Sequence, residues 1–218
     1  MSGLASLPTI DWHLFTRVGE AQILLPAAVL ALLALARSAA GRRLARSWLA
    51  ALALAVLLTT ASKVAFIGWG VGSAVLDFTG ISGHAMFAAA VYPLLGATLV
   101  PGERPGWVRA AVVAGALLAL LVGVSRVITQ AHSVSEVIAG LVVGGAVGVL
   151  ALGHARSPRG HFGLWAPTLV ALWLVATPRL APPSQTHAIV TRLALAISGH
   201  ERPYTRAELH ARERLNRV

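Results

Sequence analysis

Long apolar stretches alternate with short polar segments along the first 180 residues of the chain. A helix needs about 20 mostly apolar residues to cross the hydrocarbon core of a bilayer, and inside lipid its backbone polar groups must be bonded within the segment. The pattern therefore predicts an all-α, polytopic transmembrane helix bundle of about six spanning helices. The predicted spans are residues 21–37, 47–69, 83–100, 107–125, 134–153 and 162–180.

The C-terminal part of the chain differs from the rest. Pro167 interrupts the sixth span and Pro178 ends it, so this span is the weakest of the set. A short amphipathic stretch over residues 187–198 and an Arg-rich end follow. We therefore expect two parts, a membrane-embedded helical domain over residues 1–180 and an Arg-rich amphipathic C-terminal tail over residues 181–218.

The composition supports a membrane location and limits the kinds of molecule that the protein is expected to bind. Only 12% of the side chains are charged, about half of the share in a globular domain, and the mean hydropathy is +0.74. This disfavours an ordinary soluble domain and excludes a disordered chain. The chain has no Cys, which excludes a disulfide framework and a thiolate metal site. The net charge of +10 comes from 17 Arg and one Lys against 8 acids. In so apolar a chain this excess indicates cytoplasmic loops and anionic headgroups, so we expect membrane lipids as partners and no nucleic acid.

The arginines also predict an orientation. Cytoplasmic loops carry an excess of Arg and Lys. The second and fourth loops contain one basic residue each, Lys63 and Arg126. Loops one, three and five are therefore predicted to be cytoplasmic, and loops two and four, with both termini, to face outward. The six arginines of the tail fit this poorly, so either the sixth segment does not cross or the tail lies on the outer leaflet. The basic residues of the predicted cytoplasmic loops are Arg37, Arg42, Arg43, Arg46, Arg104, Arg109, Arg156 and Arg159.

The outward loops hold most of the ionisable groups near the predicted spans, and such groups are costly unless they have a function. Lys63 is the only lysine in the chain; its alternative role is a snorkelling anchor. Asp77, in the same loop, is explained as a solvated carboxylate. Ser82 and Gly83 begin the third span, where free N–H groups and the helix dipole favour an anion. His84 follows on the first turn and can donate a proton, although an N-cap serine beside a histidine is also a common helix start.

The fourth loop, which is predicted to face outward, contains three further ionisable side chains. Arg126 can hold a phosphate in bidentate fashion. His132 and Glu136 are four residues apart and share a helix face. A carboxylate behind an imidazole fixes its tautomer and raises its basicity, which prepares the other ring nitrogen for attack. The alternative is a polar patch at the interface, but three such clusters on one side of the membrane favour a site.

The third cluster resembles a motif of the phosphatidic acid phosphatase type 2 superfamily, membrane lipid phosphatases related to vanadium haloperoxidases. That family shows Lys-x6-Arg-Pro, then Pro-Ser-Gly-His, then Ser-Arg-x5-His-x3-Asp. The third motif appears here as Ser125-Arg126, His132 and Glu136, with Glu for Asp. The second appears as residues 81–84, Ile-Ser-Gly-His, without the proline. The first is reduced to Lys63, because Gly-Val stands where Arg-Pro falls.

The resemblance covers about residues 50–150 and implies a role for each matching residue. His132 is then the nucleophile that forms a phospho-histidine, Glu136 orients it, and His84 protonates the leaving oxygen. The phosphoryl oxygens are held by the remaining four groups, and no metal or cofactor is implied. The missing arginine leaves one phosphate contact unfilled, which Arg202-Pro203 can supply only if the tail folds back outside. The implied phosphate-binding groups are Lys63, Ser82, Gly83 and Arg126.

Together these features predict a metal-independent lipid phosphatase. It would hydrolyse a phosphomonoester or diphosphate of a lipid, such as undecaprenyl diphosphate or a phospholipid phosphate, at the outer face of the membrane. The Ala- and Arg-rich, Lys-poor composition suggests a bacterial source, so we expect an integral protein of the inner membrane with its active site facing the periplasm or exterior. A lipid phosphotransferase and a non-catalytic lipid-phosphate binder or transporter on the same fold are the alternatives, and the oligomeric state stays open.

Overall fold

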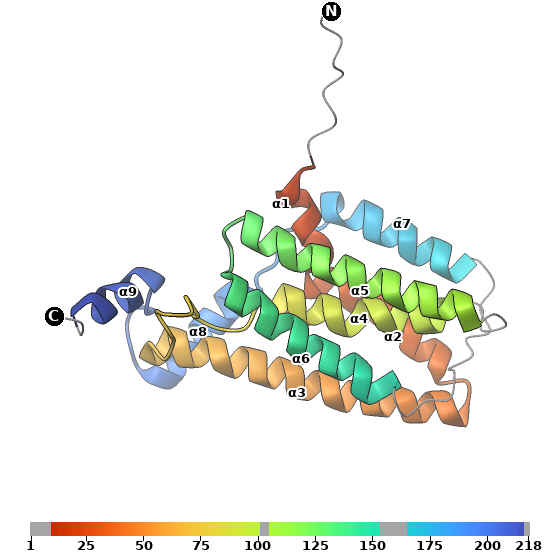
Figure 1. The fold of residues 1–218 in the computed structure, drawn as a ribbon. Coiled ribbons are helices and arrows are strands. Elements are labelled where there is room, and N and C mark those ends of the chain that lie inside the picture. Colours follow the sequence, from red (N-terminus) through yellow and green to blue (C-terminus); the bar gives the residue numbers. More distant parts are fainter. Residues whose placement is uncertain (1–9, 101–104, 153–164, 216–218) are drawn as a thin grey trace, which may run out of the picture.

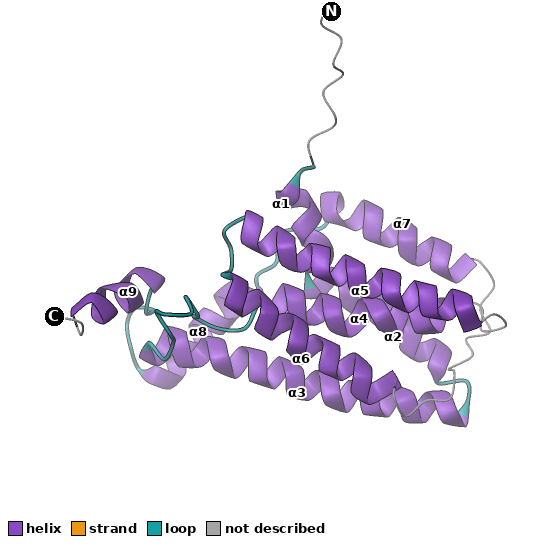
Figure 2. Cartoon of the chain, viewed as in Figure 1, coloured by secondary structure: helices purple, strands orange, loops and turns teal. Residues whose placement is uncertain are grey.

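The structure is a computed structural model that describes residues 10–100, 105–152 and 165–215. Within these residues the regular elements are helices, apart from one isolated β-bridge between Ser73 and Phe78 (Figure 2). The all-α prediction is therefore confirmed. The elements are α1 (Trp12–Phe15), η1 (Thr16–Gly19), α2 (Ala21–Leu35), α3 (Ala39–Trp69), α4 (Gly83–Leu99), α5 (Pro105–Ile128), α6 (Val134–Leu152), α7 (Trp165–Leu180), α8 (Thr186–Ser198) and α9 (Arg206–Leu215).

Each of the predicted spans coincides with most of one of the helices α2 to α7, and α3 begins eight residues before its predicted span. Three of them, α3, α5 and α6, are long and apolar enough to cross a membrane, and the α1–η1 segment with α2, bent by 42°, makes up to a fourth. Helices α4 and α7 have only 17 and 16 residues. These long apolar helices are consistent with a membrane protein, but the predicted count of about six crossings is not confirmed, because the described residues contain three helices, or four with the bent pair, that are long enough to cross.

Contrary to the prediction, the prolines of the sixth span do not break its helix. Pro167 does not interrupt α7, because it lies in the first turn of the helix, where a backbone N–H has no partner within the helix. Pro178 lies inside α7, which continues to Leu180. The weak point of the predicted span is thus a regular helix that packs against α2 and η1.

Helix α4 lies in the middle of the bundle, with α2, α3, α5 and α6 around it (Figure 1). Glycines allow this close packing. A Cβ at Gly115 of α5 would lie 2.6 Å from the carbonyl oxygen of Tyr92, and one at Gly140 of α6 would lie 2.5 Å from that of Ser82. A Cβ at Gly144 would overlap the carbonyl oxygen of Met86. The small residues of α6 therefore serve packing inside this chain, against α4.

The bundle exposes apolar side chains along its sides. Leucine, valine and isoleucine side chains of the three long helices are about half exposed or more, which is unfavourable in water and expected against lipid. This surface supports the membrane assignment independently of helix length. The residues are Leu54, Leu57 and Leu58 on α3, Leu117, Leu120, Leu121 and Val124 on α5, and Ile138, Val142 and Val149 on α6.

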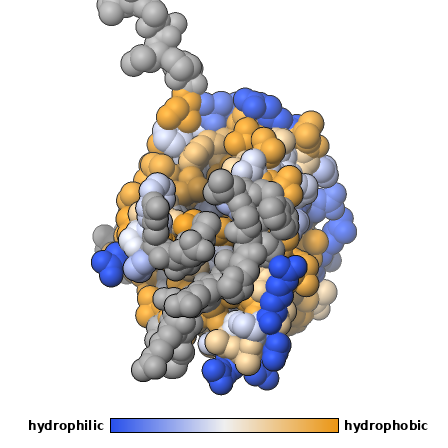
Figure 3. All heavy atoms as spheres, turned by 90° about the vertical axis from the view of Figure 1, so that its right-hand side faces the viewer, coloured by the Kyte–Doolittle hydropathy of each residue, from blue (hydrophilic) through white to orange (hydrophobic). Residues whose placement is uncertain are grey.

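The two ends of the bundle differ. Residues 70–82, residues 129–133 and α9 lie together at one end, and the α2–α3 turn lies at the other (Figure 1). Figure 3 looks onto the end with this turn, where hydrophilic residues lie around the edge. Arg42, at the start of α3, donates to the carbonyl oxygen of Ala36 there at 3.1 Å. Candidate site residues are thus concentrated at the opposite end from this first Arg-rich loop.

The C-terminal tail packs against the end of α3. Val190 and Ala194 of α8 form a small core with Phe66 and Ile67. The stretch over residues 187–198 lies within α8, and the helix α9 that follows it was not predicted. The tail therefore lies at the same end of the bundle as the two predicted outward loops.

Candidate active site

The site is built around His132 and Glu136, where the α5–α6 loop enters α6. The ring Nδ1 of His132 is 2.7 Å from Oε2 of Glu136, and the backbone N–H of Ser133 donates to the same oxygen at 3.1 Å. A turn at Gln130, with a left-handed φ of 55°, brings the loop back toward this helix start. With its proton on Nδ1, facing the carboxylate, the imidazole keeps a lone pair on Nε2. The pairing of His132 with Glu136 is therefore present, but the two residues do not share a helix face, because α6 begins at Val134 and His132 lies in the loop before it.

The second oxygen of Glu136 is held from two other parts of the chain. Oε1 accepts hydrogen bonds from the backbone N–H of Thr79 at 2.6 Å, from its hydroxyl at 2.5 Å, and from Nη2 of Arg206 at 2.9 Å. The side chain of Glu136 is completely buried. Both oxygens therefore have fixed partners, and a buried carboxylate with full pairing is the form that a folded protein tolerates.

The start of α4 lies beside this pair. The backbone N–H of Ser82 donates to the carbonyl oxygen of Glu136 at 3.1 Å, which ties the two helix starts together. Ser82 is the N-cap residue of α4, but its hydroxyl accepts no hydrogen bond from the helix. Its Oγ is buried and has no partner among the described residues. The hydroxyl and the free N–H groups of the first turn, from Gly83 onward, are thus available to an anion.

Lys63 lies under a short segment that joins the β-bridge to α4. The backbone N–H of Ile81 donates to Ser62 Oγ at 3.0 Å, so this segment runs along α3. A Cβ at Gly80, whose φ is +139°, would be 2.9 Å from Cγ of Lys63, so this position requires glycine. Within the described residues no hydrogen bond or ion pair is found for the Lys63 ammonium.

Arg126 ends α5 and reaches toward the N-terminal part of the chain. Its Nη1 donates to Thr16 Oγ1 at 3.1 Å, while its Nε is buried without a partner in the described residues. The side chains of Arg126, Lys63 and His132 all interact electrostatically with His84. These four predicted site residues therefore lie close enough for their charges to interact.

The electrostatics of the imidazole follow from this surrounding. The pKa of His132 is lowered from its ordinary value because the ring is buried, and the charges of Lys63 and Arg126 lower it further. The hydrogen bond to Glu136 and its negative charge act in the opposite direction. The net result is a neutral ring at pH 7, beside cationic side chains that have unused donors.

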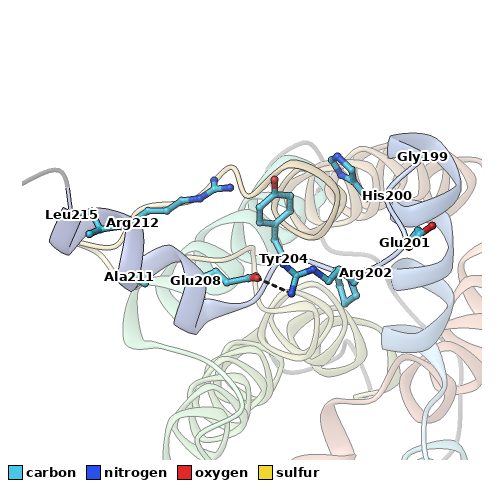
Figure 4. Close-up of a pocket in the computed structure, with 10 residues that line it drawn as sticks. Gly199, His200, Glu201, Arg202, Tyr204, Glu208, Ala211, Arg212 and Leu215 are labelled. Carbon is cyan, nitrogen blue, oxygen red and sulfur yellow. Dashed lines mark ion pairs between the residues drawn. The ribbon is translucent and has the colours of Figure 1, made fainter.

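The structure corrects one expectation about the tail. Arg202 does not supply the missing phosphate contact, since its side chain is 85% exposed and pairs with Glu208 at 3.5 Å. The pocket drawn in Figure 4 is lined by residues 199–215 and contains none of the candidate catalytic residues. Residues 197–200 repeat the Ile-Ser-Gly-His sequence of residues 81–84, and His200 in this second copy donates to the carbonyl oxygen of Gly68. That second copy of the motif is therefore part of tail docking.

Sequence reasoning missed two residues that touch Glu136, namely Thr79 and Arg206. Asp77 is also more than a solvated carboxylate, because it pairs with Arg206 at 2.5 Å and with His210 at 2.7 Å. One local signal was available for the tail. Thr205 and Glu208 form a capping box, a pattern that marks a helix start. In the described residues, no group of three or more His, Asp or Glu side chains is arranged to hold a metal.

Similarity to known proteins gives the family of the chain. A family model described as the PAP2 superfamily matches residues 44–156, a segment that includes the candidate catalytic residues. The chain is also similar to a protein of Klebsiella pneumoniae named "Uncharacterized 22.5 kDa protein in cps region", with 35% identity over 208 residues, 92% of this chain and 98% of that protein. No solved structure gives a significant match. Phosphatases of phosphate esters are typical of the matched family. The chain therefore belongs to the PAP2 superfamily.

Proposed function

We propose that the protein is a metal-independent lipid phosphatase that works through a phospho-histidine intermediate. The observation that carries the proposal is the His132–Glu136 pair at 2.7 Å, together with Ser82 Oγ and Arg126 Nε, which are buried without a hydrogen-bond partner in the described residues. A neutral imidazole next to unused cationic and hydroxyl donors fits an anionic, electrophilic ligand. A phosphoryl group has both properties.

In the proposed reaction, Nε2 of His132 attacks phosphorus, and the bond from phosphorus to the lipid oxygen breaks. The leaving oxygen takes the electron pair and a proton from His84. Water then attacks the phosphorus of the phospho-histidine and gives a proton to His84, the phosphorus–nitrogen bond breaks, and phosphate leaves with both histidines restored. Glu136 stabilises the positive charge that the ring acquires, as a carboxylate does behind a catalytic histidine. Lys63, Ser82, the Gly83 N–H and Arg126 stabilise the charge on the phosphoryl oxygens.

A lipid substrate is supported by the position of these residues in the molecule. They lie at the end of a bundle whose long helices expose apolar side chains, so an acyl or isoprenoid chain can remain in the bilayer while its headgroup reaches the site. Polyprenyl diphosphates, with undecaprenyl diphosphate as the example, and phospholipid phosphates are the proposed classes. The proposed place is a bacterial inner membrane, with the site on the periplasmic side, because the first Arg-rich loop lies at the opposite end.

Phosphate release by the detergent-purified protein tests the proposal. The substrates are a panel of lipid phosphates and diphosphates, assayed in EDTA, with His132→Ala as the matched variant. We expect metal-independent release, reduced by about 10³-fold or more in the variant. Release that depends on a divalent metal, or that persists in His132→Ala, would contradict the mechanism. Binding without release by a folded protein would favour a binder or a transferase that lacks its acceptor.

A further inference from the structure

The C-terminal tail reaches into the site through one side chain. Nη2 of Arg206 donates to Oε1 of Glu136 at 2.9 Å and to the hydroxyl of Thr79 at 3.1 Å. Its Nη1 lies 2.5 Å from Oδ2 of Asp77 and 2.8 Å from the carbonyl oxygen of the same residue. The guanidinium therefore links the tail, the loop before α4 and the carboxylate behind His132.

Arg206 is held in place by the structure of the tail itself. The hydroxyl and backbone N–H of Thr205 bond to Glu208 in the capping box that begins α9, so Arg206 is the first residue of a defined helix. One step earlier, the backbone N–H of Tyr204 donates to the carbonyl oxygen of Ile67 at 3.0 Å. The side chain of Arg206 is only 35% exposed. A planar guanidinium anchored in this way fixes its acceptors in direction as well as distance.

Glu136 needs such an anchor more than an aspartate would. Its side chain has one more methylene and one more rotatable bond, so the carboxylate can turn away from the imidazole. Two donors hold Oε2, from His132 and Ser133. The opposite oxygen is held by Thr79 and by Arg206, and only Arg206 brings a positive charge there. A buried carboxylate is stabilised when its charge is paired.

We propose that Arg206 is a positioning residue of the active site, which holds Oε1 of Glu136 so that Oε2 stays on Nδ1 of His132. This inference rests on the proposed phosphatase function. It makes the C-terminal tail a part of the site, although Arg206 touches neither the attacking nitrogen nor the groups assigned to the phosphate. The other charged and titratable groups acting on His132 are Glu136, Lys63, Arg126 and His84, and Arg206 acts through the first of these.

The test compares Arg206→Ala and Arg206→Lys with two tail controls in the full-length protein. His210→Ala removes a tail contact with Asp77 and leaves Glu136 untouched. Arg212→Ala removes an arginine of the same helix that lies 4.7 Å from the Tyr204 ring. We expect Arg206→Ala to lower kcat by about 10- to 100-fold with little change in KM. Lysine should restore part of the loss, and the controls should stay within about twofold of the wild type.

A double-mutant cycle separates positioning from tail docking. If Arg206 acts through Glu136, adding Arg206→Ala to the Glu136→Gln variant should cause little further loss of kcat. If Arg206 only docks the tail, its cost should be the same in both backgrounds, and His210→Ala should show a similar loss. Either of these results would overturn the proposal.

A second measurement does not depend on catalysis. The ring nitrogens of His132 report its tautomer by NMR in ¹⁵N-labelled, detergent-solubilised protein, with His132→Ala used for assignment. We expect a single Nδ1–H tautomer in the wild type and a mixture in Arg206→Ala, with His210→Ala unchanged. An unchanged tautomer in Arg206→Ala would contradict the positioning role. If the wild type releases no phosphate from any lipid of the panel, the proposed function fails, and this comparison still decides whether Arg206 positions the pair.

Discussion

At the scale of single residues, the site depends on how one carboxylate is held. Glu136 stands where related motifs carry aspartate, and its partners come from three separated segments, residues 132–133, Thr79 and Arg206. The partners lie at distances that suit the longer side chain. The position of the His132 ring therefore depends on all of these contacts to Glu136 together.

The replacement of Glu136 by the shorter aspartate tests this fit. In Glu136→Asp the carboxylate withdraws by about one carbon–carbon bond length, about 1.5 Å. It then loses either His132 or the donors Thr79 and Arg206, so we expect kcat to fall by about tenfold or more despite the resemblance to the family motif. The measurement is phosphate release under saturating substrate. Wild-type turnover in Glu136→Asp would show that the contacts adapt without cost.

The pKa of His132 gives a prediction for the pH dependence. Only the neutral ring attacks, and burial lowers its pKa from the ordinary value. Activity should therefore persist as the pH falls from 8 to about 6.5 and decline only below that value. Glu136→Gln removes the contact that raises this pKa, so the acidic decline should move to still lower pH. The profiles of kcat/KM are compared on one substrate, whose own ionisation is then common to both. A shift of the variant to higher pH would contradict the assignment.

At the scale of the elements, close contacts between helices set the distances within the site. Helix α6 carries Glu136, α4 begins at Gly83, and glycines of α6 lie directly against the α4 backbone. The sequence predicted these helices well, because apolar runs of spanning length leave few alternatives in lipid. It could not predict that α9 joins the site, since the contact between Arg206 and Glu136 links positions 70 residues apart and produces no local periodicity.

Two adjacent glycines of α6 test the contact between α4 and α6. A Cβ at Gly144 would overlap the backbone of Met86, whereas one at Gly145 meets nothing within 4 Å. Gly144→Ala should therefore lower the thermal unfolding midpoint in detergent, with a cost of about 1–3 kcal/mol, and reduce turnover. Gly145→Ala is the matched control and should resemble the wild type in both respects. Equal midpoints for the two variants would show that α6 shifts freely along α4.

At the scale of the whole molecule, the first Arg-rich loop and the candidate site lie at opposite ends of an apolar bundle. The basic first loop lies at one end, and the site lies at the other with the docked tail (Figure 1). The positive-inside rule applies to short loops near the spans, so the arginines of the tail need not oppose it when they are used for contacts within the protein. Arg206 has such contacts with Asp77 and Glu136. The tail is therefore compatible with the outward side, which leaves the orientation as the feature of the whole molecule to be tested.

The chain contains no cysteine, so single cysteines can report the orientation without background. Ala39 at the start of α3 and Ala207 in α9 are both exposed, at opposite ends of the bundle. In intact bacterial cells whose outer membrane has been made permeable, a membrane-impermeant maleimide should label Ala207→Cys and spare Ala39→Cys. Disruption of the inner membrane should then make both sites reactive. Labelling of Ala39→Cys alone in intact cells would reverse the orientation and place the site in the cytoplasm. Labelling of both would mean that the bundle does not separate its two ends across the membrane, which would contradict the proposed orientation.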